Sequence, residues 1–253
     1  MPRKARVKSE SGIYHIILRG INHQVIFLDD EDRHKLIETL AHYKEICEYQ
    51  LYAFCLMNNH FHLLLKVGTD PLEQIMRRIC GSYVYWYNRK YHRIGNLFQD
   101  RFKSEPVEDD KYFITVLRYI HQNPIKAGIA KDIKNYKWSS YIEYIEDKGL
   151  TDREFVLKMF SEDKSKAIKE FVKYTEENND DECLEIEEKA IRLSDEELMK
   201  IIEQKFKVKS IMIQNKPKEE KERILRELLK IKGISTRQLA RVTGVSPNVI
   251  WRL

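Results

Sequence analysis

Long apolar runs and paired cysteines are both missing from this 253-residue chain. No stretch approaches the roughly twenty apolar residues that span a bilayer, and no apolar segment follows the basic N-terminus as it would in a signal peptide. The four cysteines form no C-x-x-C pair, so we expect reduced thiols that pack, rather than a zinc site or a disulfide framework. These absences favour a cytoplasmic protein with no membrane partner.

Acidic side chains are scarce at the C-terminal end. Residues 204–253 hold 4 acidic and 13 basic side chains, a net charge of +9, whereas residues 151–203 carry −8 and residues 1–150 carry +4. A strongly basic tail and a mildly basic body predict an anionic partner that is held at two places. Net charge does not distinguish a nucleic acid from an acidic protein.

Apolar periodicity predicts the order strand, helix, strand, strand, helix, strand, helix in the first half of the chain. Asn58 and Asn59 separate the second and third strands as a tight turn. Asp70 is a candidate cap of the second helix, and the third helix is expected to stop before Pro124. The order matches an α+β fold, a ferredoxin-like split βαβ sheet with one added helix. The expected strands cover residues 12–20, 51–57, 60–67 and 97–108, and the expected helices cover 29–50, 70–92 and 109–123.

The segment MNNHFHLLLK places two histidines two residues apart in a strand. Residues i and i+2 point to the same face, so His60 and His62 would stand side by side. Two neutral imidazoles in that position can bind one divalent cation. A His-x-His pair also arises by chance, so a second feature must support it.

Tyr119 and Asn123 lie four residues apart in the third expected helix, so they share one face of it. A tyrosine hydroxyl can act as an oxygen nucleophile, and an amide oxygen is an acceptable ligand for Mg²⁺ or Mn²⁺. Each residue also has an ordinary explanation. The chain holds 14 tyrosines, most of which will pack or lie at the surface, and asparagine before proline is a common helix end.

Four segments, LMNNHFHLLLK, GNLFQDRFKS, LRYIHQNPIKAGI and YKWSSY, together resemble the single-tyrosine HUH transposases of the IS200-like superfamily, and within them the REP-associated tyrosine transposases. The resemblance covers about residues 1–145. It implies that His60 and His62 bind a divalent metal ion, Mg²⁺ or Mn²⁺, and that Asn123 completes the site. It also implies that Tyr119, rather than Tyr112, is the nucleophile.

The resemblance implies a metal-dependent cleavage of single-stranded or hairpin DNA through a covalent 5′-phosphotyrosine, followed by strand transfer. One alternative is a related endonuclease that nicks single strands without moving an element. Another is a DNA-binding regulator with an inactive site, against which the intact His60, His62, Tyr119 and Asn123 argue. Members of the family include monomers and homodimers, so both remain open. The family usually has proline where this chain has Asn58, a departure that affects the turn rather than the ligands.

Aromatic and basic side chains interleave in residues 81–103, a composition that suits unpaired bases and phosphates. Tyr83, Tyr87 and Tyr91 fall at helical spacing, so part of this stretch is expected to be a buried helix face. The candidates for phosphate contacts are Arg89, Arg93, Arg101 and Lys103.

The basic tail has its own pattern. Ser194 and Glu197 form a capping-box signature, and STRQLARVTGVSPNVIWRL predicts two short helices joined by a turn at Gly244. The pattern resembles the helix-turn-helix domain at the C-terminus of the replication initiator DnaA, which implies a contact with duplex DNA. Plain helical bundles give the same pattern, and the second helix is short for insertion into a groove, so the tail could hold phosphates without reading sequence. The candidate contacts are Arg237, Arg241, Asn248 and Arg252.

The expected organisation has three parts. Residues 1–150 form the transposase-like domain, residues 151–193 form an acidic helical connector to which we assign no chemistry, and residues 194–253 form a small all-helical DNA-binding domain.

Overall fold

The computed structural model describes residues 6–185, 193–231 and 233–252. The chain divides into two compact units, residues 1–186 and residues 187–253, which are described separately. None of the helices in the described ranges is both long and apolar enough to span a bilayer.

A four-stranded sheet forms the centre of the first unit. Its strands are β1 (Ile13–Arg19), β2 (Gln50–Leu56), β3 (His60–Lys66) and β4 (Lys103–Pro106). The spatial order is β2-β3-β1-β4, and all three neighbouring pairs are antiparallel. This order is that of the split βαβ sheet, so the predicted α+β fold is confirmed.

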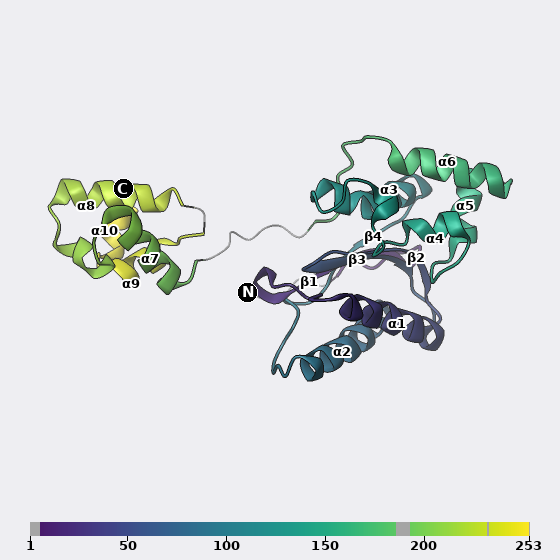
Figure 1. Ribbon diagram of the computed structural model, residues 1–253, viewed down its shortest axis with the longest axis horizontal. Coiled ribbons are helices and arrows are strands. Elements are labelled where there is room, and N and C mark those ends of the chain that lie inside the picture. Colours follow the sequence, from purple (N-terminus) through teal and green to yellow (C-terminus); the bar gives the residue numbers. More distant parts are fainter. Residues whose placement is uncertain (1–5, 186–192, 232, 253) are drawn as a thin grey trace. The chain divides into compact units, whose positions relative to one another are not determined.

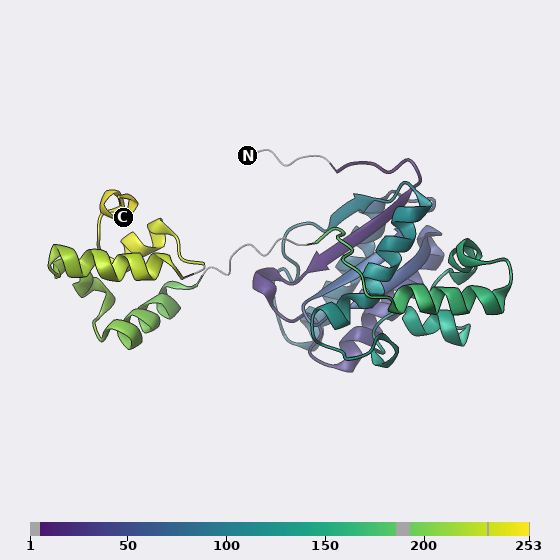
Figure 2. The same ribbon diagram turned by 90° about the horizontal axis from the view of Figure 1, so that it is seen from above.

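Helices cover both faces of the sheet (Figure 1). One face packs on α1 (Asp30–Cys47) and α2 (Leu72–Lys90), through strand residues such as Ile16 and Leu63. The other face carries α3 (Asp110–Lys126), α4 (Tyr141–Glu146), α5 (Arg153–Phe160) and α6 (Lys164–Glu176), which Figure 2 shows from above. Short 3-10 turns occupy Ile21–His23 and Ile133–Asn135. The alternation of side chains along β1 and β3 therefore decides which residues meet α3.

Local expectations differ from the structure at three points. Asp70 does not cap α2, whose N-cap is Pro71, because its carboxylate instead binds Arg78 at 2.6 Å. Helix α3 continues through Pro124 to Lys126: the proline lies in the last turn, and the N–H of Ala127 still bonds to the carbonyl of Asn123 at 2.9 Å. Strand β4 spans only four residues of the expected 97–108.

Helices α5 and α6 also differ from the expected connector of residues 151–193. Their apolar sides are buried against α3 and the sheet, with Val156 and Phe171 both fully covered. The ring of Phe171 stacks on that of Tyr144, with 4.5 Å between centroids. Residues 151–176 therefore belong to the core of the first unit. The sequence prediction missed the apolar stripe because it used the net charge of the segment, which is acidic.

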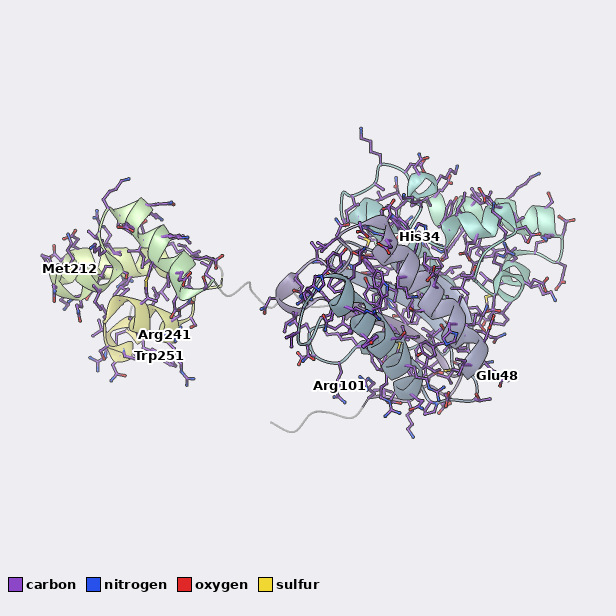
Figure 3. All side chains as sticks on the ribbon, turned by 60° about the horizontal axis from the view of Figure 1, so that its bottom comes forward. His34, Glu48, Arg101, Met212, Arg241 and Trp251 are labelled. Atoms are coloured by element: carbon purple, nitrogen blue, oxygen red, sulfur yellow. The ribbon has the colours of Figure 1, made fainter. Side chains whose placement is uncertain are left out.

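The second unit contains helices only, within the residues the structure describes: α7 (Asp195–Phe206), α8 (Lys218–Leu229), α9 (Thr236–Thr243) and α10 (Pro247–Trp251), with a 3-10 turn at Ser210–Asn215. Both hydrogen bonds of the Ser194 and Glu197 capping box are present. Gly244 adopts a φ of 71°, which favours glycine, and joins α9 to α10. Met212 and Trp251 lie at the surface of this unit, with 51% and 79% of their areas exposed (Figure 3).

Candidate active site

Two histidines, one half-buried and one buried, project from the sheet towards α3. In the register of β1 and β3, Ile17 lies opposite His62 and Arg19 lies opposite His60. His60 and His62 therefore share the face that α3 covers, as the alternation predicted. Their ring centroids are 5.1 Å apart.

Tyr119 comes to this face from α3. The residue is 2% exposed, and its ring lies 6.0 Å from that of His62, centroid to centroid, with the edge of one ring towards the other. Asn123 follows one turn later, where its Nδ2 donates to the carbonyl of Tyr119 at 3.1 Å. The structure thus brings His62 and Tyr119 into contact and places Asn123 next to them on the same helix.

Burial keeps both imidazoles neutral. It lowers the pKa of His60 to about 4 and that of His62 well below its ordinary value, because a charged ring is poorly solvated there. Nδ1 of His60 lies 2.7 Å from Oδ1 of Asn59, an atom that only accepts, so the proton of this ring sits on Nδ1 and leaves a lone pair on Nε2. Nε2 of His62 is buried with no hydrogen-bond partner in the described part of the chain. Two such nitrogens fit a divalent cation.

The hydroxyl of Tyr119 has a partner that sequence reasoning missed. It donates to Oε1 of Glu185 at 2.7 Å. Burial first, and the Glu185 carboxylate second, raise the pKa of Tyr119 far above its ordinary range. The phenol is therefore protonated at neutral pH. No local pattern could have indicated this contact, because 66 residues separate its members.

Glu185 belongs to an acidic segment, residues 177–185, that follows α6 and lies along α3. Asp181 accepts two hydrogen bonds from the guanidinium of Arg118, at 2.7 and 2.9 Å, and its carbonyl accepts one from Lys126 at 3.2 Å. Nζ of Lys103 donates to the carbonyl of Glu185 at 3.3 Å. The segment therefore brings negative charge to the cationic surroundings of Tyr119.

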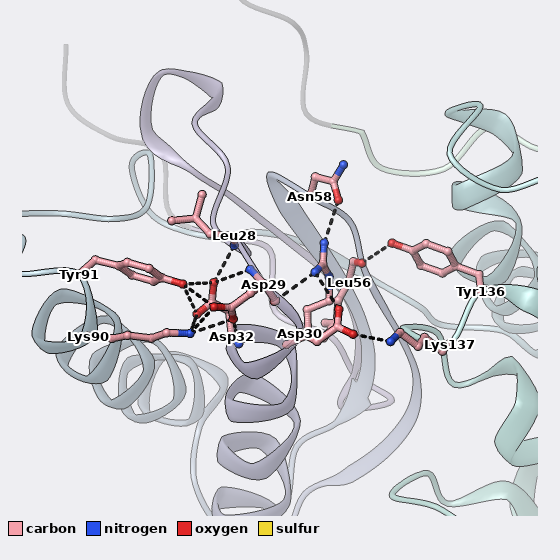
Figure 4. Close-up of polar contacts among 11 residues, drawn as sticks. Leu28, Asp29, Asp30, Asp32, Leu56, Asn58, Lys90, Tyr91, Tyr136 and Lys137 are labelled. Carbon is pink, nitrogen blue, oxygen red and sulfur yellow. Dashed lines mark hydrogen bonds and ion pairs between the residues drawn. The ribbon is translucent and has the colours of Figure 1, made fainter.

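The turn before His60 is held by residues near the start of α1. The carbonyl of Asn58 accepts from the N–H groups of Ile26 and Phe27 at 3.0 and 3.3 Å, and its side chain accepts from Arg33 at 2.9 Å (Figure 4). Asn59 is also fixed, because its carbonyl accepts a hydrogen bond from the N–H of Gly20 at 2.8 Å. Asn58, where the family resemblance led us to expect proline, thus has a partner of its own in Arg33.

A second network in Figure 4 fixes the start of α1 against the end of α2. Nζ of Lys90 contacts Asp29 at 2.7 Å and the fully buried Asp32 at 2.9 Å, and the hydroxyl of Tyr91 donates to Asp32 at 2.9 Å. Asp29 also caps α1. This network supports the same helix from which Arg33 reaches the turn.

The candidates for phosphate contacts do not all gather at Tyr119. Lys103 pairs with Ile17 in the register of β4 and β1, so it shares the face of His62. Arg89 is exposed on α2, which packs on the opposite face of the sheet. Arg93 donates to Oε1 of Gln24 at 3.3 Å, and Arg101 is exposed in the loop before β4 (Figure 3).

In the second unit, Arg237, Asn248 and Arg252 are exposed as expected of contact residues. Arg241 instead makes a two-pronged ion pair with Asp195, at 2.6 and 2.7 Å, and so joins α9 to the start of α7. Helix α10 contains only five residues, as short as the sequence suggested.

The first unit is similar in sequence and fold to known proteins. Residues 8–123 match the family described as "Transposase IS200 like". A Haemophilus influenzae protein described as a REP-associated tyrosine transposase is 25% identical over 142 residues, which are 48% of this chain and 80% of the relative. A solved REP-associated tyrosine transposase bound to a REP hairpin has the same fold, with a TM-score of 0.51 and 19% identity over 60% of this chain and 90% of that one. The first unit of this chain is therefore similar in sequence and fold to the IS200-like tyrosine transposases, a family of DNA-processing enzymes.

Proposed function

We propose that the first unit cleaves single-stranded or hairpin DNA through a covalent 5′-phosphotyrosine on Tyr119 and transfers the strand to a new end. The observation that carries this proposal is the contact between the ring of Tyr119 and the neutral, buried His62, with His60 beside it. A hydroxyl nucleophile and two lone-pair nitrogens on one face are the groups that phosphodiester cleavage needs. The solved relative is bound to a REP hairpin, which supports a hairpin partner.

His60 and His62 would hold the divalent ion through Nε2, and Asn123 would add its amide oxygen. Within the described residues, no group of three or more His, Cys, Asp and Glu side chains could hold a metal, so the amide and the DNA phosphate are needed to complete the ligands. Nitrogen donors suit Mn²⁺ better than Mg²⁺. A bound ion would neutralise a phosphate oxygen at the scissile bond.

Tyr119 supplies the attacking atom. Its Oη–P bond forms while the bond from phosphorus to the 3′ oxygen breaks; the phenol loses its proton, and the leaving strand gains one at its 3′ oxygen. Because burial keeps the phenol protonated, the proton must leave during the step. The phosphotyrosine keeps the energy of the broken ester, so a second 3′ hydroxyl can reverse the step and join DNA without ATP. Lys126, whose Nζ lies 5.1 Å from the centroid of the Tyr119 ring, and Lys103, which donates to the carbonyl of Glu185, would bind flanking phosphates.

The proposal is tested by incubating the protein with Mn²⁺ and a labelled single-stranded hairpin library, then mapping any protein–DNA adduct by mass spectrometry. An adduct on Tyr119, released when a strand with a free 3′ hydroxyl is added, is the expected result. An adduct that is never rejoined would favour the nicking endonuclease. Hairpin binding without any adduct would favour the silent regulator and overturn the proposal.

We expect Glu185→Gln to increase the rate of adduct formation, by roughly two- to fivefold, the size of an exposed charge interaction. The Glu185 carboxylate accepts a hydrogen bond from the Tyr119 hydroxyl, which must leave it to approach phosphorus. The negative charge of Glu185 also repels the phosphodiester. The rate is measured in single-turnover cleavage of a hairpin. Glu182→Gln, an exposed acid on the same segment, is the matched control and should change little. A slower Glu185→Gln would instead make Glu185 the base that accepts the tyrosine proton.

For the second unit we propose duplex binding by the helix-turn-helix pattern of α9 and α10. Deleting residues 194–253 should weaken duplex affinity and reduce the slope of log K against log salt by roughly 3, because each lost phosphate contact removes about 0.9. Fluorescence anisotropy over a salt series measures both. The double variant Arg237→Ala, Arg252→Ala should lose roughly 2 units of slope while Arg241→Ala, already paired with Asp195, loses less. An unchanged slope in the deletion would reject the tail as a DNA clamp.

A further inference from the structure

His15, on β1, is a buried histidine in contact with the candidate site. It is fully covered, and it lies opposite Leu64, two residues beyond His62 on the same face. Its Nε2 is 3.1 Å from Nδ1 of His62, and the two rings stack with centroids 5.4 Å apart and 22° between planes. The centroid of the Tyr119 ring lies 5.9 Å from that of His15, with 70° between the two planes. One side chain thus touches both a candidate ligand and the candidate nucleophile.

Only one proton occupies the hydrogen bond between two neutral imidazoles, so it has two possible arrangements. If His15 donates from Nε2, His62 carries its own proton on Nε2, and that nitrogen cannot bind a cation. If His62 donates from Nδ1, its Nε2 has a free lone pair, and His15 carries its proton on Nδ1. The second arrangement alone leaves His62 able to act as a ligand.

The neighbouring ligand is oriented differently. Nδ1 of His60 bonds to Oδ1 of Asn59, an atom that can only accept, so its tautomer is fixed by the amide. For His62, among the described residues, the partner of Nδ1 is His15. Proteins commonly fix a ligating histidine by giving its second nitrogen a hydrogen-bond acceptor, and here an imidazole occupies the acceptor's place.

We propose that His15 is a positioning residue, which accepts the hydrogen bond from Nδ1 of His62 and so turns the Nε2 lone pair towards a divalent cation. The inference deepens the proposed function and rests on it, because His62 must be a ligand for its tautomer to matter. It predicts that any side chain able to accept at this point can replace His15, and that one of similar size without an acceptor cannot.

The test measures Mn²⁺ binding by calorimetry on the full chain without DNA. His15→Phe keeps a ring but has no acceptor, and should weaken Mn²⁺ affinity roughly ten- to a hundredfold. His15→Gln places an amide oxygen near the position of Nε2 and should stay within roughly threefold of the unchanged protein. Long-range ¹H–¹⁵N spectra of the histidine rings should show the proton of His62 on Nδ1 in the unchanged protein and in His15→Gln, and not in His15→Phe.

His121 provides the matched control, because it is also fully buried and bonds through Nε2, here to Oγ of Ser140 at 2.9 Å. His121→Phe should lower thermal stability and leave Mn²⁺ affinity unchanged. Equal Mn²⁺ binding in His15→Phe and the unchanged protein, or equal losses in His15→Phe and His15→Gln, would overturn the positioning role. If His62→Gln also leaves Mn²⁺ affinity unchanged, the failure lies in the proposed metal site rather than in His15.

Discussion

Tyr119→Phe should abolish the covalent protein–DNA adduct, a fall of at least roughly a thousandfold in adduct formed per unit time. The substitution removes the oxygen that attacks phosphorus and nothing else, since the ring remains packed against His15 and His62. The lost hydrogen bond leaves Glu185 exposed to water, so the free energy of unfolding should change by about 1 kcal/mol or less. Denaturing gel electrophoresis of a labelled hairpin reaction, with a binding assay beside it, measures the two effects.

Tyr112→Phe is the matched control for this experiment. Tyr112 lies on the same helix, but its hydroxyl donates to Glu105 at 2.6 Å, whereas that of Tyr119 donates to Glu185. The Tyr112 variant should form the adduct at a near-normal rate. An adduct that persists in Tyr119→Phe and disappears in Tyr112→Phe would show that the nucleophile is Tyr112, about two helical turns nearer the N-terminus of α3.

His60→Ala should weaken Mn²⁺ affinity by at least roughly a hundredfold and should bring cleavage close to background. The loss should exceed that caused by removing a residue that only hydrogen-bonds to a metal ligand. His60 is only half-buried, so its removal leaves no closed cavity, and the fold should survive. The substitution removes the Nε2 lone pair of His60, which is free to bind a cation because the ring proton on Nδ1 bonds to Asn59. Calorimetry with Mn²⁺ and a single-turnover cleavage assay are the measurements.

An exposed histidine of α1 serves as the control. His42 lies on the helix that packs on the opposite face of the sheet, so His42→Ala should bind Mn²⁺ and cleave as the unchanged protein does. Normal cleavage by His60→Ala would return the His-x-His pair to a role in packing. Hairpin affinity measured in the absence of metal should be unaffected in both variants.

Local periodicity was enough to establish the frame of the first unit. The period of two along 60–67 placed His60 and His62 on one face, and the period of 3.6 along 109–123 placed Tyr119 and Asn123 on one face of a helix. Both patterns depend only on backbone geometry, so neighbours in the sequence contain the information. The order of the elements then restricted the topology to the split βαβ sheet.

Composition was a weaker guide. The acidic average of residues 151–203 concealed the apolar stripe that buries Val156 and Phe171, because net charge ignores which face a residue occupies. Asp70 had the sequence of a cap, yet Arg78, eight residues later, offered it a charged partner, and the ion pair was formed instead of the cap. An N-cap is worth about 1 kcal/mol, which an ion pair with a residue two turns along the same helix can outweigh.

Taken by itself, the sequence determined that His60 and His62 share one strand face and that Tyr119 and Asn123 share one helix face, because both placements follow from repeats of two to four residues. The order of the elements indicated the sheet, and the family resemblance singled out Tyr119 among the tyrosines. Tertiary structure alone decided that Glu185 meets Tyr119 and that His15 meets His62, contacts that join residues 66 and 47 positions apart. Such contacts form only when strand register and helix packing bring distant segments together, and their energy depends on that arrangement rather than on the identity of neighbouring residues. The sequence therefore predicted the candidate ligands and nucleophile, but not the groups that orient and cover them.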